Sequence, residues 1–287
     1  MKIQAPAKIN IYLKVLHKRT DGYHELKTIM VPLSLSDEIR LEKTDQGIAL
    51  NASGCNCADE DNLVYKAASL FFESTGVRSG IAIKVTKRIP VGAGLGGGSS
   101  DATGVLMGLN DLFHTGLTQG ELMQMAGKIG ADCPFFVLGR PMLMGSRGDK
   151  IVQEVSLEER AYLLIVPPLS LSTAKVCSTL KYPLTTEKDT LTIYNIGNIM
   201  IAPEQWLEND LETAAFGICP ELRLIKEELL VAGALGVLMS GSGSSIFGVF
   251  KDTGHLYNAM SRIKRHYGYR YIPTTALTGE RYGNNGS

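Results

Sequence analysis

Apolar and polar residues alternate along the first part of the chain. Between residues 7 and 15 every second position is apolar, namely Ala7, Ile9, Ile11, Leu13 and Val15. A period of two predicts a β-strand that is buried on one face and polar on the other. Lys8 and Asn10 stand two residues apart on the polar face, so we expect their side chains to point the same way.

Further alternating segments predict strands at residues 27–34, 38–43, 80–90 and 161–167. The last of these begins a second unit of strands and helices. We therefore predict two domains, one over residues 1–155 and the other over residues 156–287.

Apolar residues at helical spacing follow Asn62 and return after Ser100. Thr118 and Glu121 form a Thr-x-x-Glu capping box, which predicts a helix that ends near Gly130. The second unit contains two more predicted helices, at residues 203–215 and 220–232.

The strongest chemical signal lies between a predicted strand and a predicted helix. It is the run Pro90, Val91, Gly92, Ala93, Gly94, Leu95, Gly96, Gly97, Gly98, Ser99 and Ser100. Glycine lets a backbone approach an anion with no Cβ in the way, and a helix N-terminus offers unpaired N–H groups. The run therefore predicts a phosphate-binding loop. A glycine-rich surface turn without a ligand is the alternative, but such turns rarely precede an amphipathic helix.

The glycine spacing by itself leaves two nucleotide sites open. Gly92, Gly94 and Gly97 match the G-x-G-x-x-G fingerprint of dinucleotide-binding dehydrogenases. The motif is far from the first predicted strand, however, and no strand ending in an acidic residue follows about 20 residues later to bind a ribose. No Gly-Lys-Ser or Gly-Lys-Thr follows, and the protein-kinase signatures are absent. A small-molecule kinase is therefore favoured over a dehydrogenase.

Composition narrows the classes of partner. The 287 residues include 29 Lys+Arg and 29 Asp+Glu, so no net charge attracts nucleic acid or a membrane surface. No apolar run is long enough to cross a bilayer, and the N-terminus lacks the apolar core of a signal peptide. The five cysteines and five histidines show no disulfide or metal-binding spacing. We expect a cytoplasmic protein without a metal site of its own, which is a monomer or a weak homodimer.

Four motifs stand in a fixed order along the chain. They are Pro6-Ala7-Lys8-Ile9-Asn10, Asp21-Gly22-Tyr23-His24, the run at 90–100 and Gly130-Ala131-Asp132-Cys133-Pro134. Together they resemble the GHMP kinase superfamily, and within it the 4-diphosphocytidyl-2-C-methyl-D-erythritol kinases. The cluster at 240–244 resembles the superfamily's C-terminal glycine motif. The resemblance implies an α/β (α+β) fold of two domains, an ATP-binding half like domain 2 of ribosomal protein S5 and a ferredoxin-like half.

The resemblance also implies a reaction. ATP, with Mg²⁺ carried by the nucleotide, would phosphorylate the 2-hydroxyl of 4-diphosphocytidyl-2-C-methyl-D-erythritol in the non-mevalonate isoprenoid pathway. Asp132 would be the base and Lys8 its electrostatic partner. From spacing alone, Asp132 suits a helix cap before Pro134 equally well, and Lys8 suits a solvated strand face.

The residues that the resemblance assigns to the substrate are Asn10, Tyr23, His24 and Thr173. The Tyr-His pair would meet the cytosine, by stacking and by hydrogen bonds. Relatives carry a second aromatic residue near the position of Cys177. We therefore expect either that Tyr182 replaces it or that the cytosine is stacked on one side only.

Overall fold

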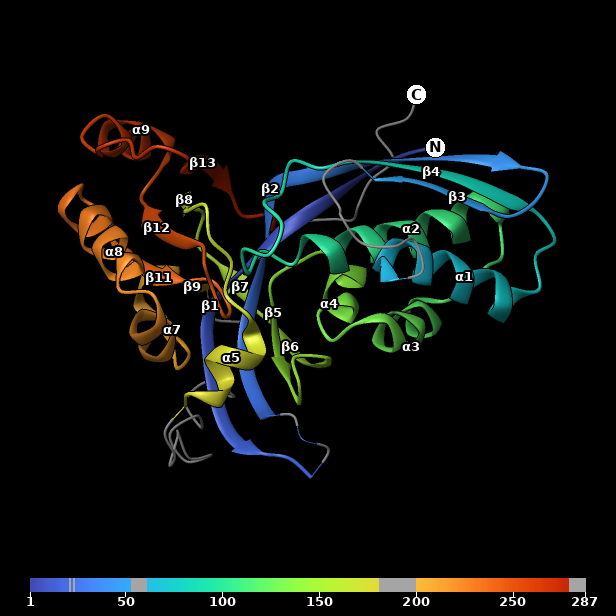
Figure 1. Cartoon of the computed structure of the whole chain (residues 1–287), viewed down its shortest axis with the longest axis horizontal. Coiled ribbons are helices and arrows are strands. Elements are labelled where there is room, and N and C mark those ends of the chain that lie inside the picture. The colour runs from blue at the N-terminus through green and yellow to red at the C-terminus, as the bar shows by residue number, and fades with distance from the viewer. Residues whose placement is uncertain (21, 23, 53–60, 181–199, 279–287) are drawn as a thin grey trace.

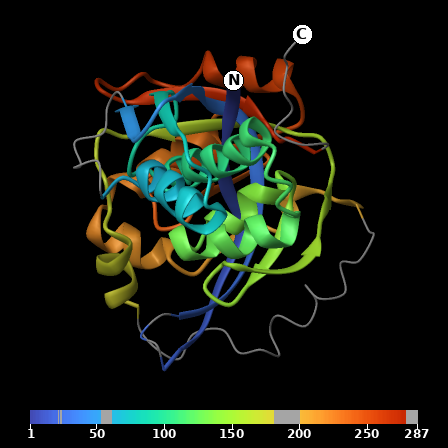
Figure 2. The ribbon, with the colours of Figure 1, turned by 90° about the vertical axis from the view of Figure 1, so that its right-hand side faces the viewer.

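The computed structural model describes residues 1–20, 22, 24–52, 61–180 and 200–278. Two main β-sheets lie in the middle of the molecule, and helices cover the outer face of each (Figure 1). In the view turned by 90°, the helices drawn in cyan and green lie in front of the long blue strands (Figure 2). The order across the molecule is thus helices, sheet, sheet and helices.

The first sheet carries the N-terminal motifs and is mostly antiparallel. Its strands are β1 (Lys2–Lys18), β2 (His24–Thr44), β3 (Ile48–Ala52), β4 (Gly80–Thr86), β5 (Met142–Gly145), β6 (Lys150–Glu154) and β10 (Glu208–Asn209). The helices on its outer side are α1 (Leu63–Thr75), α2 (Gly97–Phe113), α3 (Gln119–Ile129) and α4 (Cys133–Leu138). β2 runs antiparallel to β1, β4 and β5. A dinucleotide-binding domain needs a parallel sheet, so the dehydrogenase alternative does not fit this fold.

The second sheet has the strand order β11-β12-β8-β13. These strands are β8 (Ala161–Val166), β11 (Gly236–Met239), β12 (Ile246–Phe250) and β13 (Arg270–Thr275). The helices beside them are α7 (Glu212–Ile218), α8 (Glu221–Val231) and α9 (Thr253–Met260). The remaining elements connect the halves and are α5 (Thr173–Ser178), the short strands β7 (Ser156–Leu157) and β9 (Met200–Ile201), and a 3₁₀ turn at Pro203–Gln205.

The two sheets share an apolar core. Ile9 on β1 and Val31 on β2 belong to the same buried cluster as Tyr162 on β8 and Phe247 on β12. Separate clusters lie between each sheet and its own helices. Because apolar side chains fill the space between the sheets, the halves pack as one unit.

β1 differs from the half-buried strand that the alternation predicts. Lys8 and Asn10 on its polar face are buried, with exposed fractions of 5% and 1%. Register shifts flank them, between Pro6 and Lys8 and between Asn10 and Tyr12. Such bulges re-aim side chains, and they bring Ile11 and Tyr12, which are neighbours in sequence, into the same core cluster. The half-buried strand that the alternation predicts was therefore wrong for this part of β1, because helices cover its polar face as well.

The remaining element predictions have mixed outcomes. The capping box is confirmed, since Thr118 and Glu121 each bond the other's backbone N–H at the start of α3. The predicted strands at 27–34 and 38–43 are parts of the single strand β2. The helix at 203–215 was wrong: the segment contains the 3₁₀ turn, β10 and the start of α7.

The division at residue 155 stays a prediction. β10 lies beyond that position and yet pairs with β1, through Tyr12 opposite Glu208 and Leu13 opposite Asn209.

Within the described ranges, no helix combines the length and the apolar character needed to span a membrane.

Candidate active site

The glycine-rich run forms a loop between β4 and α2 and continues from Gly97 into the first turn of α2, and both halves of the molecule hold the loop. From the first sheet, the backbone N–H of Lys8 donates to the carbonyl of Leu95 at 2.9 Å. From the second half, the hydroxyl of Ser240 donates to the carbonyl of Gly94 at 3.0 Å. The cluster at 240–245, which follows β11, thus bonds the loop from the second half of the molecule.

Glycine is required in the loop for two separate reasons. Gly92, Gly94 and Gly96 have positive φ angles of 69°, 76° and 69°, which residues with a Cβ rarely adopt. Neighbouring atoms also fill the space around two of them. A Cβ on Gly94 would lie 2.3 Å from the carbonyl oxygen of Ser240, and one on Gly96 would lie 2.9 Å from Cγ of Lys8.

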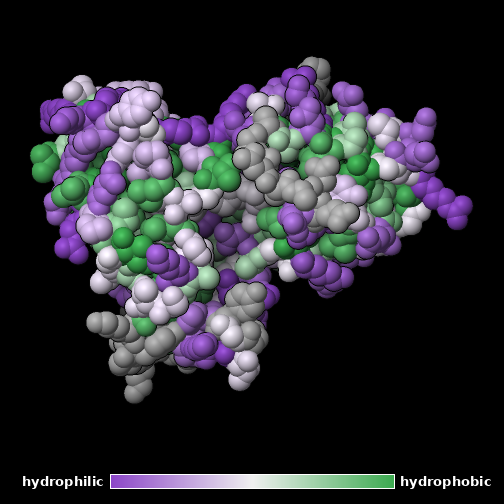
Figure 3. Space-filling view, viewed as in Figure 1, coloured by the Kyte–Doolittle hydropathy of each residue, from purple (hydrophilic) through white to green (hydrophobic). Residues whose placement is uncertain are grey.

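A cavity of about 380 Å³ opens beside this loop, at the N-terminus of α2. No side chain caps α2, so the N–H groups of its first turn are suited to an anion. Ser99 lines the cavity, whereas Ser100 is fully buried and does not line it. Residues outside the loop supply an apolar wall and a few polar groups, and they include Ala52, Leu63, Val64, Val85, Asn62 and Lys87. Figure 3 shows the surface hollowed between the two halves, with hydrophilic side chains inside the hollow.

Lys8 and Asp132 meet next to the loop. The Lys8 Nζ lies 3.5 Å from Asp132 Oδ2, and the Asp132 side chain is 31% exposed. Asp132 occupies the position before α4, but its side chain makes no capping hydrogen bond. A solvated lysine and a capping aspartate, the two alternatives that spacing left open, therefore find no support in the structure.

Asn10 fixes the position of the lysine. Lys8 Nζ donates to Asn10 Oδ1 at 2.6 Å, and Asn10 Nδ2 donates to Thr28 Oγ1 at 2.8 Å. The Thr28 hydroxyl in turn donates to the carbonyl of Tyr12 at 2.7 Å. This chain of hydrogen bonds compensates the burial of the ammonium group, and it explains why Asn10 faces the same way as Lys8.

A second charged cluster backs the cavity, and sequence reasoning missed it. Lys87 Nζ lies 2.5 Å from Asp37 Oδ2 and 2.7 Å from Asp101 Oδ2. The other Asp101 oxygen, Oδ1, is buried and has no hydrogen-bond partner among the described residues. Burial raises the pKa of Asp101 to about 7, with a further rise from Asp37, although the positive charge of Lys87 opposes it. Only the position of Asp101 directly after the serines could have pointed to this cluster.

Lys8 contacts one oxygen of the Asp132 carboxyl group, and the turn between β5 and β6 lies near the other oxygen. A Cβ on Gly148 in this turn would lie 4.0 Å from Asp132 Oδ1. The same turn contacts the start of β2, where the N–H of Leu26 donates to the carbonyl of Ser146 at 2.6 Å. His24 is the first residue of β2, and burial together with the charge of Lys18 lowers its pKa. Its imidazole is therefore neutral at pH 7 and has one donor and one acceptor nitrogen.

Of the other residues predicted to bind the substrate or to lie near it, the structure describes some and not others. The hydroxyl of Thr173 lies 2.7 Å from that of Ser242, so it adjoins the 240–245 cluster. Cys177 packs against the apolar cluster of the second half, and burial raises the pKa of its thiol. Tyr23 and Tyr182 lie outside the described residues, so their roles stay predictions.

Two family models match the sequence. The GHMP kinases N terminal domain matches residues 62–140, and the GHMP kinases C terminal domain matches residues 198–268. A 4-diphosphocytidyl-2-C-methyl-D-erythritol kinase of Syntrophotalea carbinolica is 42% identical over 93% of this chain and 95% of its own length. The enzyme of the same name from a Geobacter species is 41% identical over 94% and 96%.

Solved structures resemble this fold as well. A crystal structure of 4-(cytidine 5'-diphospho)-2C-methyl-D-erythritol kinase superposes with a TM-score of 0.80 at 35% identity, covering 97% of this chain and all of the other. Homoserine kinase from Cytophaga hutchinsonii has a TM-score of 0.72 at 19% identity, covering 97% of this chain and 94% of the other, and shows the fold alone.

Proposed function

The chain belongs to the 4-diphosphocytidyl-2-C-methyl-D-erythritol kinases among the GHMP kinases and is an ATP-dependent kinase; from this premise we propose that it phosphorylates the 2-hydroxyl of 4-diphosphocytidyl-2-C-methyl-D-erythritol. The observation that carries the proposal is the Lys8–Asp132 pair, at 3.5 Å, beside the glycine-rich loop. The pair joins a proton acceptor and a fixed positive charge beside the loop that lines the cavity, since the backbone N–H of Lys8 bonds the carbonyl of Leu95.

Asp132 acts as the base in this proposal. The acceptor oxygen forms a bond to the γ-phosphorus, the bond from that phosphorus to the ADP oxygen breaks, and the hydroxyl proton passes to the Asp132 carboxylate. A partly exposed carboxylate suits this task because an acceptor has access to it. Lys8 stabilises the negative charge that develops on the acceptor and phosphoryl oxygens, from a site that excludes most water.

The loop and the start of α2 bind the phosphates of ATP. Positive φ angles and close packing fix the loop before a ligand arrives, so little ordering is needed on binding. Among the described residues, no group of three or more His, Cys, Asp or Glu side chains could hold a metal ion. Mg²⁺ would enter with the nucleotide and offset the charge of its phosphate oxygens, and Ser99 is the loop hydroxyl suited to face it.

The acceptor extends along β2, away from Asp132. Thr28 supports the Lys8 ammonium group through Asn10, and His24 lies four residues before Thr28, at the start of the same strand. Four residues of strand span about 13 Å, which suits an elongated acceptor with a polyol at one end and a base at the other. A neutral His24 offers one donor and one acceptor to the polar edge of cytosine.

The test is an ADP-release assay with ATP and a panel of acceptors. We expect turnover with 4-diphosphocytidyl-2-C-methyl-D-erythritol and little above background with mevalonate, homoserine or galactose. Efficient turnover of one of these three, with none of the cytidylyl compound, would contradict the proposed acceptor while leaving the kinase activity intact.

A further inference from the structure

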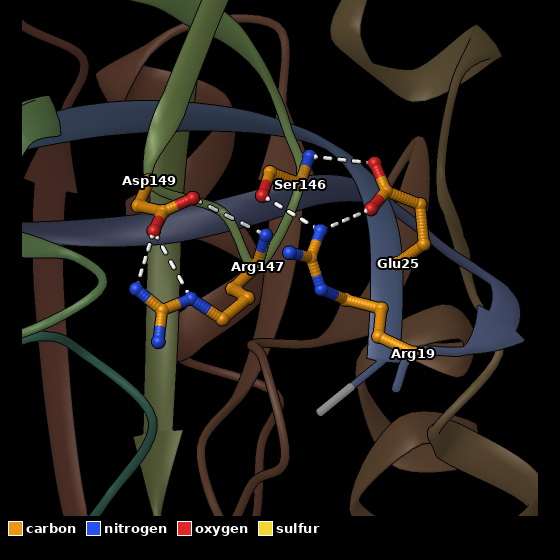
Figure 4. Close-up of polar contacts among 5 residues, drawn as sticks. All are labelled: Arg19, Glu25, Ser146, Arg147 and Asp149. Carbon is orange, nitrogen blue, oxygen red and sulfur yellow. Dashed lines mark hydrogen bonds and ion pairs between the residues drawn. The ribbon is translucent and has the colours of Figure 1, made fainter. Parts of the chain in front are cut away.

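The β1–β2 hairpin and the β5–β6 turn are joined by a polar network that the proposed catalytic steps do not use. Figure 4 shows Glu25, Arg19 and Ser146 each joined to the other two by hydrogen bonds. Glu25 Oε1 accepts from the backbone N–H of Ser146 at 3.0 Å, and Oε2 accepts from Arg19 Nη1 at 2.6 Å. Arg19 Nη1 also donates to the Ser146 hydroxyl at 3.0 Å. Both carboxylate oxygens of Glu25 thus accept hydrogen bonds that hold the turn, one from Ser146 directly and one from Arg19, which also bonds Ser146.

The turn needs such support because its backbone is unfavourable. Ser146 has a φ of 61°, in the left-handed region that costs free energy for any residue with a Cβ. A residue stays in this region only where its surroundings enforce it, and such positions are concentrated at functional sites. Here the enforcing groups are Glu25, whose carboxylate accepts from the N–H of Ser146, and Leu26, whose backbone N–H donates to the carbonyl of Ser146.

The far end of the same turn reaches the catalytic carboxyl group. Gly148 has a φ of 92°, and a Cβ there would lie 3.3 Å from Met30 Cε and 4.0 Å from Asp132 Oδ1. Arg147 lies between Ser146 and Gly148. Its guanidinium donates to Asp149, directly after Gly148, through Nε at 3.1 Å and Nη2 at 2.7 Å. Burial alone would raise the pKa of Asp149, but its contacts with Arg147 lower it, so the carboxylate stays charged. The turn therefore behaves as one rigid piece from Ser146 to Asp149.

We propose that Glu25 is a positioning residue for the acceptor: it fixes the β5–β6 turn and thereby sets the wall of the acceptor site between His24 and Asp132. The inference rests on the proposed function, because it assigns this side of Asp132 to the acceptor. Glu25 acts through the turn, and the cavity that takes the nucleotide is lined by other residues. Its effect is consequently confined to acceptor binding.

Glu25→Gln is the informative substitution. A carboxylate accepts hydrogen bonds at both oxygens, whereas an amide accepts at only one. The variant must therefore turn a donor group toward either Arg19 or the N–H of Ser146. Losing one charge-assisted hydrogen bond weakens the hold on the turn by a factor of about ten or more, and acceptor binding must then supply the free energy of ordering the turn. We expect KM for the acceptor to rise about tenfold or more, while KM for ATP stays within about twofold and kcat within about threefold.

Two further variants complete the experiment. Arg19→Gln removes the ion pair and leaves the Glu25–Ser146 bond, so KM for the acceptor should rise in the same direction but by less. Glu204→Gln is the matched control, since its side chain is 18% exposed against 22% for Glu25 and bonds Arg160 at 2.9 Å, outside the acceptor site. The control should leave both KM values unchanged.

The kinetic ratios are measured with whichever acceptor the wild-type chain phosphorylates, so failure of the cytidylyl assignment is seen in the wild type alone. A KM for the acceptor in Glu25→Gln within twofold of wild type would overturn the positioning role. A parallel rise in both KM values would overturn it too, because it would show a general loss of structure. If Glu25→Gln does not fold, Arg19→Gln alone decides by the same criteria.

Discussion

Lys8 is a charged side chain held almost entirely out of water, and its partner Asp132 keeps 31% of its side chain exposed. The difference suits their proposed roles. A buried ammonium group is costly unless its partners are fixed, and Asn10 supplies such a partner at 2.6 Å. The carboxylate remains accessible, as a group that must take a proton from an incoming hydroxyl requires.

Asp132→Asn tests the base directly. The amide keeps the size of the side chain but cannot take the proton, so we expect kcat to fall by about a hundred- to ten-thousand-fold. ATP affinity, measured by titration, should stay within about twofold. Asp111→Asn makes the same chemical change at an exposed position on α2 and should leave kcat unchanged. An Asp132→Asn enzyme with more than a tenth of the wild-type kcat would exclude the role of base.

Asp101 makes stability depend on pH. Its pKa in the folded chain is about 7, above the ordinary value of 3.8, mainly because it is buried. Between about pH 4 and pH 7 the folded chain therefore binds a proton that the unfolded chain has released, and stability falls as pH rises through this window.

Asp101→Asn cannot ionise, so its free energy of unfolding should vary less from pH 4 to pH 7 and exceed that of the wild type at pH 8. Denaturant titrations of both proteins at several pH values provide the measurement. Parallel pH profiles would contradict the assignment.

Single residues differed in how far the sequence could identify them. Lys8, Asn10 and Asp132 lie in short motifs, so a resemblance could point to each by position. Lys87, Asp37 and Asp101 are separated along the chain by 50 and 14 positions, and only the folded chain brings them together. The alternation in β1 predicted which residues share a face, but it carried no information on the helices that cover that face.

At the scale of elements, local signals predicted boundaries well where the backbone itself determines them. The capping box at α3 is such a case, because its hydrogen bonds join residues three positions apart. The helix predicted at 203–215 failed because tertiary contacts prevailed over spacing. There Asn209 donates from its side chain to the carbonyls of Met239 and Gly241, both at 2.8 Å, which holds the segment as a strand beside β1.

The glycine-rich loop makes a prediction at this scale. Gly94→Ala places a Cβ 2.3 Å from the carbonyl oxygen of Ser240, so the loop must move away from the position in which we propose that it binds phosphate. We expect the Kd of ATP to rise about tenfold or more, for one to two lost backbone hydrogen bonds to a charged ligand. Gly116→Ala is the matched control, because its φ of 70° imposes the same strain while no atom lies within 4 Å of the added Cβ.

The comparison of these two variants separates strain from close packing. Titration with ATP should show a weakened Gly94→Ala protein and an unchanged Gly116→Ala protein, both checked for folding by circular dichroism. Equal ATP affinities in the two would mean that the loop does not bind the phosphates.

At the scale of the whole molecule, the predicted two-domain GHMP kinase fold is confirmed by the family models and by the superposed kinase structure. Strand and helix patterns alone could not have given it, since they do not say that Ile9 and Phe247 belong to one core between two sheets. The four motifs supplied that information through resemblance. The packed interface matters for the proposed function because the 240–245 cluster of one half supports the glycine-rich loop of the other.

We propose that this chain transfers one phosphoryl group from ATP to a hydroxyl of a cytidylyl polyol. ³¹P NMR of the full chain with ATP, Mg²⁺ and 4-diphosphocytidyl-2-C-methyl-D-erythritol tests it most directly. We expect a new phosphomonoester signal in a one-to-one ratio with ADP, while the diphosphate bridge of the acceptor stays intact. ADP formed without a new monoester, or release of cytidine monophosphate from the acceptor, would contradict it.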